Sequence, residues 1–273
     1  MARRWYHEVS AEWLKARQAV LTATDVAGLL PEYRRYQKAV DKDPDQADRI
    51  WPGFAALWCQ KHSDTYLDTS AASDAAARGH IMEPWVVEAW NKQASPTYYH
   101  WDDCIICNGI LGFSPDAMVI PQLTNDPSLQ VTTDGKFLVA ASQVHYDCPS
   151  ETMETKCYEP TQHMKSIIED RMEHKELMQV AMPFAVLSSL EATRLTWFCP
   201  GAPVSMFTEK YSRSDLKEQV DLIIAIKDIY EKQAEKCMEF MMANNSLEAM
   251  CTEEEVYLEY VADQGHDDVF RLK

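Results

Sequence analysis

The pattern of apolar and polar positions divides the chain into helical, then strand-like, then helical regions. Alanine-rich or amphipathic spacing predicts helices in the first third, over residues 10–20, 22–30 and 69–93. Thr22 or Thr24 is the expected N-cap of the second helix, because a hydroxyl can accept a bond from an N–H of the first turn. Pro84 is expected to kink the third helix or to begin a new one.

The middle of the chain consists of short segments that are β-branched or alternate between apolar and polar residues. These segments are residues 104–113, 116–120, 131–141 and 151–158. Asp134-Gly135, within the third segment, is typical of a hairpin turn. We expect all four segments to form one sheet.

A second helical region follows these strands. Residues 161–190 form a long helical stretch that we expect to be interrupted near Pro183. Two further strands are predicted over residues 193–200 and 203–211. The last helix begins near Leu216, because apolar residues then recur every three or four positions, and Asn244-Asn245 supplies a C-terminal stop.

These elements predict one mixed α/β domain over residues 1–245, followed by an acidic C-terminal segment, residues 246–273. The chain has 273 residues, 46% of them apolar, which is enough for a sizeable core. It contains no run of 18 apolar residues, and its basic, polar start lacks the apolar centre of a signal peptide. We therefore expect a cytoplasmic protein without a membrane span.

The formal charge of −17 argues against a general nucleic-acid coat, which needs a basic surface. The charge is unevenly distributed, however. Residues 1–38 contain seven lysines and arginines against four acidic residues, so this part carries +3 and the remainder −20. The composition is therefore compatible with a local positive site on an acidic body.

Two carboxylates and a lysine in the strand-like region suggest a metal site. Glu154 and Lys156 are two positions apart, so on a strand their side chains project from the same face. Asp116 follows Ser-Pro at a neighbouring strand and would place a second carboxylate next to Glu154. Such a pair repels unless it is protonated or bridged by a cation, and Mg²⁺ suits one or two carboxylates with a substrate phosphate. The pattern fits phosphodiester hydrolysis, although an exposed strand face beside an ordinary turn would give the same letters.

Five motifs in a fixed order make the pattern more specific. They are EWLKARQAVLTATDVAGLL (residues 12–30), RGHIMEP (78–84), SPDAMV (114–119), ETKCY (154–158) and ELMQVAM (176–182). Together they resemble the PD-(D/E)xK nuclease superfamily, and within it the lambda-exonuclease and YqaJ-like viral recombinase branch. The resemblance covers about residues 10–240 and implies a restriction-endonuclease-like core, with a central mixed β-sheet flanked by helices.

The resemblance also assigns roles around the metal. It implies that Asp116, Glu154 and the carbonyl of Thr155 are metal ligands. Lys156 would be the catalytic lysine, and Glu83 would approach the same metal from a helix. The expected metal is Mg²⁺, with Mn²⁺ as the alternative.

Other residues are implied to hold the substrate. Arg17 would bind a terminal 5′-phosphate, with Thr24 as a helping hydroxyl, because a guanidinium matches a phosphate bidentately. Gln179 would support the site from the helix after the catalytic strand. His163 and the nearby basic residues Lys165, Arg171 and Lys175 could line a DNA path, and Trp13, Trp85 and Trp90, at helical spacing, are expected in the core rather than stacked on bases.

The chain departs from the branch at several positions. Ala117 replaces a glycine, Tyr158 replaces a proline, and Pro183 stands where a tyrosine often follows the glutamine; none of these changes removes a ligand. The interval between Asp116 and Glu154 is also long, because residues 122–147 are expected to add a hairpin.

The resemblance implies an exonuclease that degrades double-stranded DNA from 5′ ends and leaves 3′ single-stranded tails for phage-type recombination. Expected partners are duplex DNA ends, two further copies of the chain in a homotrimer, and a single-strand annealing protein, in the cytoplasm of a bacterial host carrying the phage or prophage. Two alternatives stay open: an endonuclease of the same fold, and a non-catalytic DNA-binding or interaction subunit. The intact Asp116, Glu154 and Lys156 disfavour the non-catalytic reading, and Arg17 favours the exonuclease.

Overall fold

The computed structural model describes residues 16–63, 74–100, 105–119, 138–140, 149–169 and 172–244. The helices in this part of the chain are α2 (Ala23–Val40), the 3-10 helix η1 (Pro44–Asp48), α3 (Pro52–His62), α4 (Asp74–Asn91), α5 (Pro160–Glu169), α6 (His174–Val186) and α7 (Lys217–Asn244). The strands are β1 (Tyr99–His100), β2 (Ile105–Asn108), β3 (Leu111–Phe113), β4 (Ala117–Val119), β5 (Leu138–Ala140), β6 (Glu151–Lys156), β7 (Ala192–Phe198) and β8 (Met206–Tyr211).

The strands form two sheets, so the expectation of a single sheet is wrong. The larger sheet has the order β1-β4-β6-β7-β8 and is mixed, because β6 runs parallel to β7 while the other neighbours are antiparallel. The smaller sheet has the order β3-β2-β5. Residues 105–113 pair with themselves as a hairpin, whose turn holds Gly109 at a φ of 59°, a conformation that suits glycine. β5 then extends β2 in parallel, while Asp134-Gly135 lies outside the described residues.

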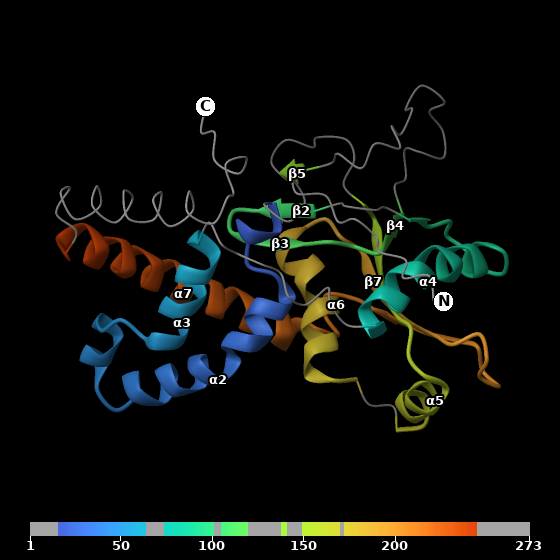
Figure 1. The fold of residues 1–273 in the computed structure, drawn as a ribbon, viewed down its shortest axis with the longest axis horizontal. Coiled ribbons are helices and arrows are strands. Elements are labelled where there is room, and N and C mark those ends of the chain that lie inside the picture. The colour runs from blue at the N-terminus through green and yellow to red at the C-terminus, as the bar shows by residue number, and fades with distance from the viewer. Residues whose placement is uncertain are drawn as a thin grey trace, which may run out of the picture.

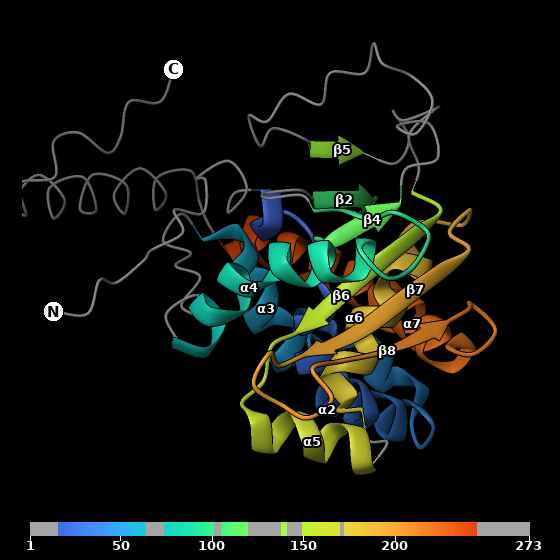
Figure 2. The same ribbon diagram turned by 90° about the vertical axis from the view of Figure 1, so that its right-hand side faces the viewer.

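Helices cover both faces of the larger sheet. Figure 2 shows α4 in front of β6, with α6 on the far side of the sheet. Val86 and Trp90 of α4 belong to one apolar cluster with Met153 of β6. A larger cluster joins α2, α6 and α7 to Leu195 and Trp197 of β7 on the other face, and α2, α3 and α7 lie together in Figure 1. β6 is therefore enclosed between two apolar layers, which makes it the central strand of the fold.

Two of the expected helix signals are confirmed. Thr22 is the N-cap of α2 and forms a capping box with Asp25. The apolar stripe predicted for the last helix is buried from Leu216 to Cys237, which is 5% exposed, whereas Met241 at its far end is 45% exposed.

Neither Pro84 nor Pro183 begins or ends a helix. Pro84 lies inside α4, which continues through it to Asn91. Pro183 also lies inside α6, so the interruption expected there is wrong. The long stretch is instead divided before α6, where Glu173 and Glu176 form a capping box that begins the helix.

The domain boundary expected at residue 245 falls just beyond the described residues, and it stays a prediction. The acidic segment 246–273 and Trp13 also lie outside them. No helix in the described part of the chain combines the length and apolarity needed to cross a membrane.

The buried carboxylate of Glu151, at the start of β6, binds side chains from β7, from β8 and from the residue that precedes β1. Glu151 Oε2 accepts a hydrogen bond from the Tyr98 hydroxyl at 2.8 Å and one from Arg194 Nε at 3.1 Å. Its Oε1 accepts one from Lys210 Nζ at 2.6 Å. Burial alone would raise the pKa of Glu151. The hydrogen bonds and charges of Lys210, Tyr98 and Arg194 lower it by more than burial raises it, so the pKa lies below its ordinary value.

Replacing Glu151 with glutamine should lower the free energy of unfolding by about 2 kcal/mol at pH 7, because the charge-assisted bonds are lost. Since the folded-state pKa is depressed, this stabilisation is present above the ordinary glutamate value of 4.5 and is lost as the pH falls through the folded-state value. Urea unfolding of both proteins across this range should show the difference shrinking in acid. The exposed Glu88, paired with Lys92 on the surface of α4, provides the control Glu88→Gln, which should change little. A difference that does not depend on pH would contradict the charge argument.

Candidate active site

The pairing of β4 with β6 places Asp116 beside Glu154. The antiparallel register pairs Ala117 with Met153, and Asp116 precedes that pair by one residue. Asp116 Oδ2 accepts hydrogen bonds from the Thr155 N–H at 2.6 Å and from Thr155 Oγ1 at 2.9 Å. The Asp116 carbonyl accepts another from His100 Nδ1 at 2.8 Å. The aspartate is therefore held against β6 by its side chain and against β1 by its backbone.

Lys156 lies with Glu154 on one side of β6. Its Nζ is 2.6 Å from Glu154 Oε1, and the two side chains are 17% and 15% exposed. Burial lowers the pKa of Lys156, but the charges of Glu154 and Asp116 and the bond to Glu154 raise it, so the pKa lies above its usual value.

The negative charges of this group are crowded. Burial raises the pKa of Asp116 well above its usual range, and the charges of Glu154 and Glu83 raise it further against the opposing effects of Lys156 and the Thr155 N–H. Glu83 reaches the group from α4, where its side chain is 15% exposed and lies 3.2 Å from His80 Nδ1. The structure therefore brings Asp116, Glu154 and Glu83 into one electrostatic unit, as the sequence predicted, although their roles stay predictions.

The donor set fits a hard divalent cation. Within the described residues, Asp116 Oδ1 and Glu154 Oε2 make no hydrogen bond, so one oxygen of each carboxylate remains for a ligand. No three His, Cys, Asp or Glu side chains in the described ranges are placed to hold an ion among themselves. A cation here would be bound by few carboxylates and would need the Thr155 carbonyl, water or phosphate oxygens as well. Mg²⁺ commonly binds in this way.

Sequence reasoning missed a further carboxylate beside the lysine, in addition to Glu154 and Asp116. Glu176 of α6 is 4% exposed, and its charge contributes to the raised pKa of Lys156. One of its oxygens accepts a hydrogen bond from the Tyr158 hydroxyl, and the other accepts one from the Glu173 N–H at 2.8 Å. Tyr158, noted in the sequence only as a departure from the branch, thus ties the end of β6 to α6. The capping-box spacing of Glu173 and Glu176 was the only local signal of this arrangement.

A second link ties β6 to α4. Arg78 forms an ion pair with Glu159, and its Nη2 donates to the Cys157 carbonyl at 3.2 Å. Burial raises the pKa of the Cys157 thiol to about 12, with the charges of Glu83 and Asp116 adding to the effect. The residues after β6 are therefore anchored to the same helix that carries Glu83.

The predicted substrate residues lie on α6, on α2 and in the turn that precedes α2. Gln179 is half-buried on α6, one turn after Glu176. Arg17 is half-buried in a helical turn at residues 16–18, and Thr24 is exposed in the first turn of α2. Leu21, between them, forms a bridge with Leu111 of β3. The roles of Gln179, Arg17 and Thr24 stay predictions.

Two other sequence interpretations are wrong. His163 is fully buried, and its Nε2 donates to the Val204 carbonyl at 2.7 Å, so it cannot line a DNA path. Lys165 and Lys175 are exposed, while Arg171 lies outside the described residues. Trp85 is 59% exposed and does not belong to the core, whereas Trp90 is 9% exposed and does.

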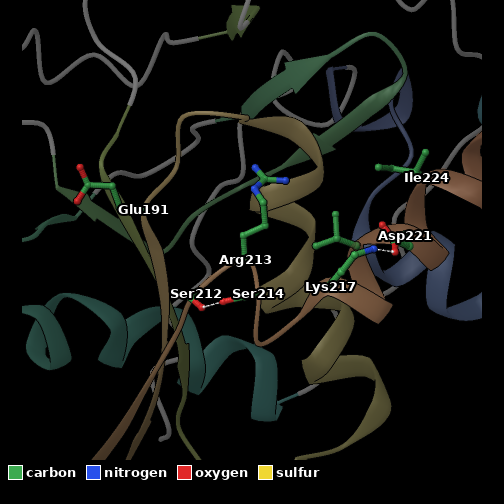
Figure 3. A pocket seen from close by; sticks show the side chains of 8 residues that line it. Glu191, Ser212, Arg213, Ser214, Lys217, Asp221 and Ile224 are labelled. Carbon is green, nitrogen blue, oxygen red and sulfur yellow. Dashed lines mark hydrogen bonds and ion pairs between the residues drawn. The ribbon is translucent and has the colours of Figure 1, made fainter.

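A cavity of about 600 Å³ lies away from the carboxylates. Figure 3 shows that it is lined by Glu191, which precedes β7, and by Arg213, Lys217 and Asp221 around the start of α7. In the parallel register Glu151 pairs with Ala192, while Lys156 pairs with Trp197 at the opposite end of the strands. The cavity therefore belongs to the other end of the sheet, and its charges are balanced between acidic and basic side chains.

Two solved structures and one family model match this chain. The structure is similar to that of LHK-Exo in complex with dAMP, with a TM-score of 0.57 and 14% identity over 86% of this chain and 97% of that chain. It is also similar to a structure of the alkaline exonuclease LHK-Exo from Laribacter hongkongensis, with a TM-score of 0.51 and 15% identity over 85% of this chain and 100% of that one. No curated protein sequence matches the chain.

At these identities the structural similarity shows the fold, a PD-(D/E)xK-like core, and confirms the expected fold class. The sequence matches the YqaJ-like viral recombinase domain over residues 12–193, which is more than half of the chain. This protein therefore belongs to the YqaJ-like viral recombinase domain family.

Proposed function

We propose that this protein is a metal-dependent deoxyribonuclease that degrades double-stranded DNA from 5′ ends and leaves 3′ single-stranded tails for recombination. The observation that carries this proposal is the half-buried group of Asp116, Glu154 and Lys156 on paired strands of the family's fold. The shared fold with LHK-Exo, an alkaline exonuclease whose structure holds dAMP, supports it.

Asp116 and Glu154, with the Thr155 carbonyl, are the residues that would hold Mg²⁺ or Mn²⁺. When bound, the ion would supply Lewis-acid activation of the scissile phosphate and neutralise part of its charge. Thr155 keeps Asp116 in place through two hydrogen bonds. Lys156, held 2.6 Å from Glu154, presents a positive charge that can stabilise the negative charge developing on the phosphate oxygens.

Arg17 and its neighbours would determine the direction of degradation, because they would bind the 5′ end of the DNA. A guanidinium binds a terminal phosphate bidentately, and Thr24 can add a hydroxyl bond from the first turn of α2, where the N-terminal end of the helix also favours an anion. Glu83 would approach the same metal from α4, and Gln179 would support the site from α6. The protein would then act on DNA ends in the cytoplasm of a bacterial host, together with a single-strand annealing protein.

The assembly follows from charge. An acidic monomer repels duplex DNA, whereas cyclic symmetry would place several copies of one basic patch around a central channel. The chain carries −17 in total but +3 within residues 1–38. A homotrimer that encloses the DNA, as the resemblance implies, would satisfy both facts.

Removing the charge of either carboxylate should abolish cleavage without unfolding the protein. Asp116→Asn keeps an acceptor for Thr155, and Glu154→Gln keeps the side-chain shape; each should reduce the cleavage rate by roughly 10³-fold or more, as should Lys156→Ala. Thermal melting of Asp116→Asn should give an unchanged or higher melting temperature, because crowded negative charges are relieved. The exposed Asp221 gives the control Asp221→Asn, which should cleave normally. Near-normal turnover by any of the three site variants would refute the assignment.

The terminal-phosphate role of Arg17 predicts end preference. A 5′-phosphorylated linear duplex should be degraded about tenfold faster than the same duplex with 5′-hydroxyl ends, which is what a charge-assisted bidentate pair can supply. Arg17→Ala should remove the preference, and closed circular duplex should resist cleavage. Equal rates on both ends, or rapid nicking of the circle, would favour the endonuclease instead.

The proposed homotrimer predicts the molecular mass of the protein in solution. Light scattering at micromolar concentration should give three times the 31.3 kDa of one chain. A single-chain mass together with full exonuclease activity would exclude the trimer.

A further inference from the structure

A buried lysine on α3 takes no part in the proposed chemistry. The Lys61 side chain is 5% exposed, and a buried ammonium is rarely found without a partner. Its Nζ lies 2.7 Å from Asp25 Oδ2, and the Asp25 side chain is 15% exposed. The pair joins the last turn of α3 to the first turn of α2.

The same ammonium also binds the backbone of the segment that precedes α2. Lys61 Nζ donates to the Val20 carbonyl at 2.8 Å and to the Arg17 carbonyl at 3.3 Å. These carbonyls lie at and just after the end of the helical turn at residues 16–18, where the Arg17 carbonyl also accepts from the Val20 N–H at 3.5 Å. Lys61 therefore acts as a C-cap for the turn that carries Arg17, supplied from another helix.

Asp25 couples this cap to the start of α2. Its Oδ2 accepts hydrogen bonds from the Thr22 N–H and from Thr22 Oγ1, both at 2.8 Å, in the capping box of the helix. One carboxylate oxygen thus connects Lys61 to the N-cap, two residues before Thr24. The position of the turn and the position of the helix end are set by the same ion pair.

Two further contacts hold the segment. Gln18 Nε2 donates to the Ser63 carbonyl, directly after α3, at 2.7 Å. A Cβ on Gly112 of β3 would lie 2.6 Å from Val20 Cγ2, so the segment lies directly against the strand. The backbone from Arg17 to Thr22 is consequently fixed on three sides by α2, α3 and β3.

We propose that Lys61 is a positioning residue for the 5′-phosphate site: the Lys61–Asp25 pair holds the Arg17 turn and the first turn of α2 in one arrangement, so that the guanidinium and Thr24 receive the phosphate together. This inference rests on the proposed function of Arg17. Fixing the turn before the DNA end binds avoids the entropy that would otherwise be lost on ordering it. Releasing the turn should weaken recognition of the phosphate more than it weakens phosphodiester cleavage.

The test compares the full-length protein with Lys61→Met on linear duplexes that carry 5′-phosphate or 5′-hydroxyl ends, in Mg²⁺. The measured quantity is the ratio of the two degradation rates, because partial unfolding lowers both rates together and leaves the ratio unchanged. Lys61→Met should lower the ratio about tenfold, mainly by raising KM for the phosphorylated end, since a displacement of about 1 Å can have such an effect. Lys217→Met, at an exposed ion pair on α7, is the control and should keep the ratio.

Gln18→Ala provides a second variant that cannot abolish folding, because it removes one partly buried hydrogen bond. It should lower the same ratio in the same direction by a smaller factor. If Arg17→Ala removes the preference while Lys61→Met and Gln18→Ala retain it, the positioning role is refuted and the phosphate site stands. If the unmutated protein shows no preference, the proposed function of Arg17 fails and the inference fails with it.

Discussion

The candidate site depends on one electrostatic constraint, the crowding of half-buried like charges beside Lys156. The β4–β6 register brings Asp116 to Glu154, and Glu83 adds a third negative charge from α4. Burial, and then the charges of Glu154 and Glu83, raise the pKa of Asp116 above its usual range against the opposing charge of Lys156. Contacts outside the charged group must therefore keep the carboxylates close together in the folded protein. A cation that neutralises their repulsion would bind more tightly for that reason.

The surrounding structure supplies those means at the end of β6. Arg78 binds the Cys157 carbonyl from α4, and Tyr158 binds Glu176 of α6. The strand is thus fastened to the helices on both of its faces within two residues of Lys156. Glu83 and Gln179 lie on these same helices, so the contacts that hold the charged group also fix the elements that approach it.

The sequence pattern correctly predicted those features that depend on residues close together in the chain. The cap at Thr22 and the buried stripe of α7 were correct, because both follow from residues within one or two helical turns. The break near Pro183 was wrong, because the second half of α6 is largely buried and its packing tolerates the proline near the end of the helix. The division into two sheets was not predictable, because strands of three or four residues carry no record of which distant strand they will join.

The charged group was found in the sequence because its motifs are short and ordered, but its supports were not. Tyr158 bonds to a carboxylate 18 residues away, and Lys61 contacts a segment more than 40 residues before it. In sequence Lys61 resembles any surface lysine near a helix end. Partners at such separations are brought together only by the packing of whole helices, which no local pattern encodes.

The chain leaves β4 and enters β6 at the same end of the sheet, although many residues separate the two strands. The Ser150 N–H donates to the Val119 carbonyl at 2.9 Å, so the chain re-enters β6 beside the residue where it left β4. β4 and β6 can then be regarded as the two arms of one hairpin whose connection is long. Because the entropy of closing a loop grows only slowly with its length, such a connection can gain or lose residues over evolution at little cost to the pairing below it. The arms hold the chemistry, and β5 within the connection adds a strand to the smaller sheet, so changes of length before or after β5 are the ones that both sheets can accept.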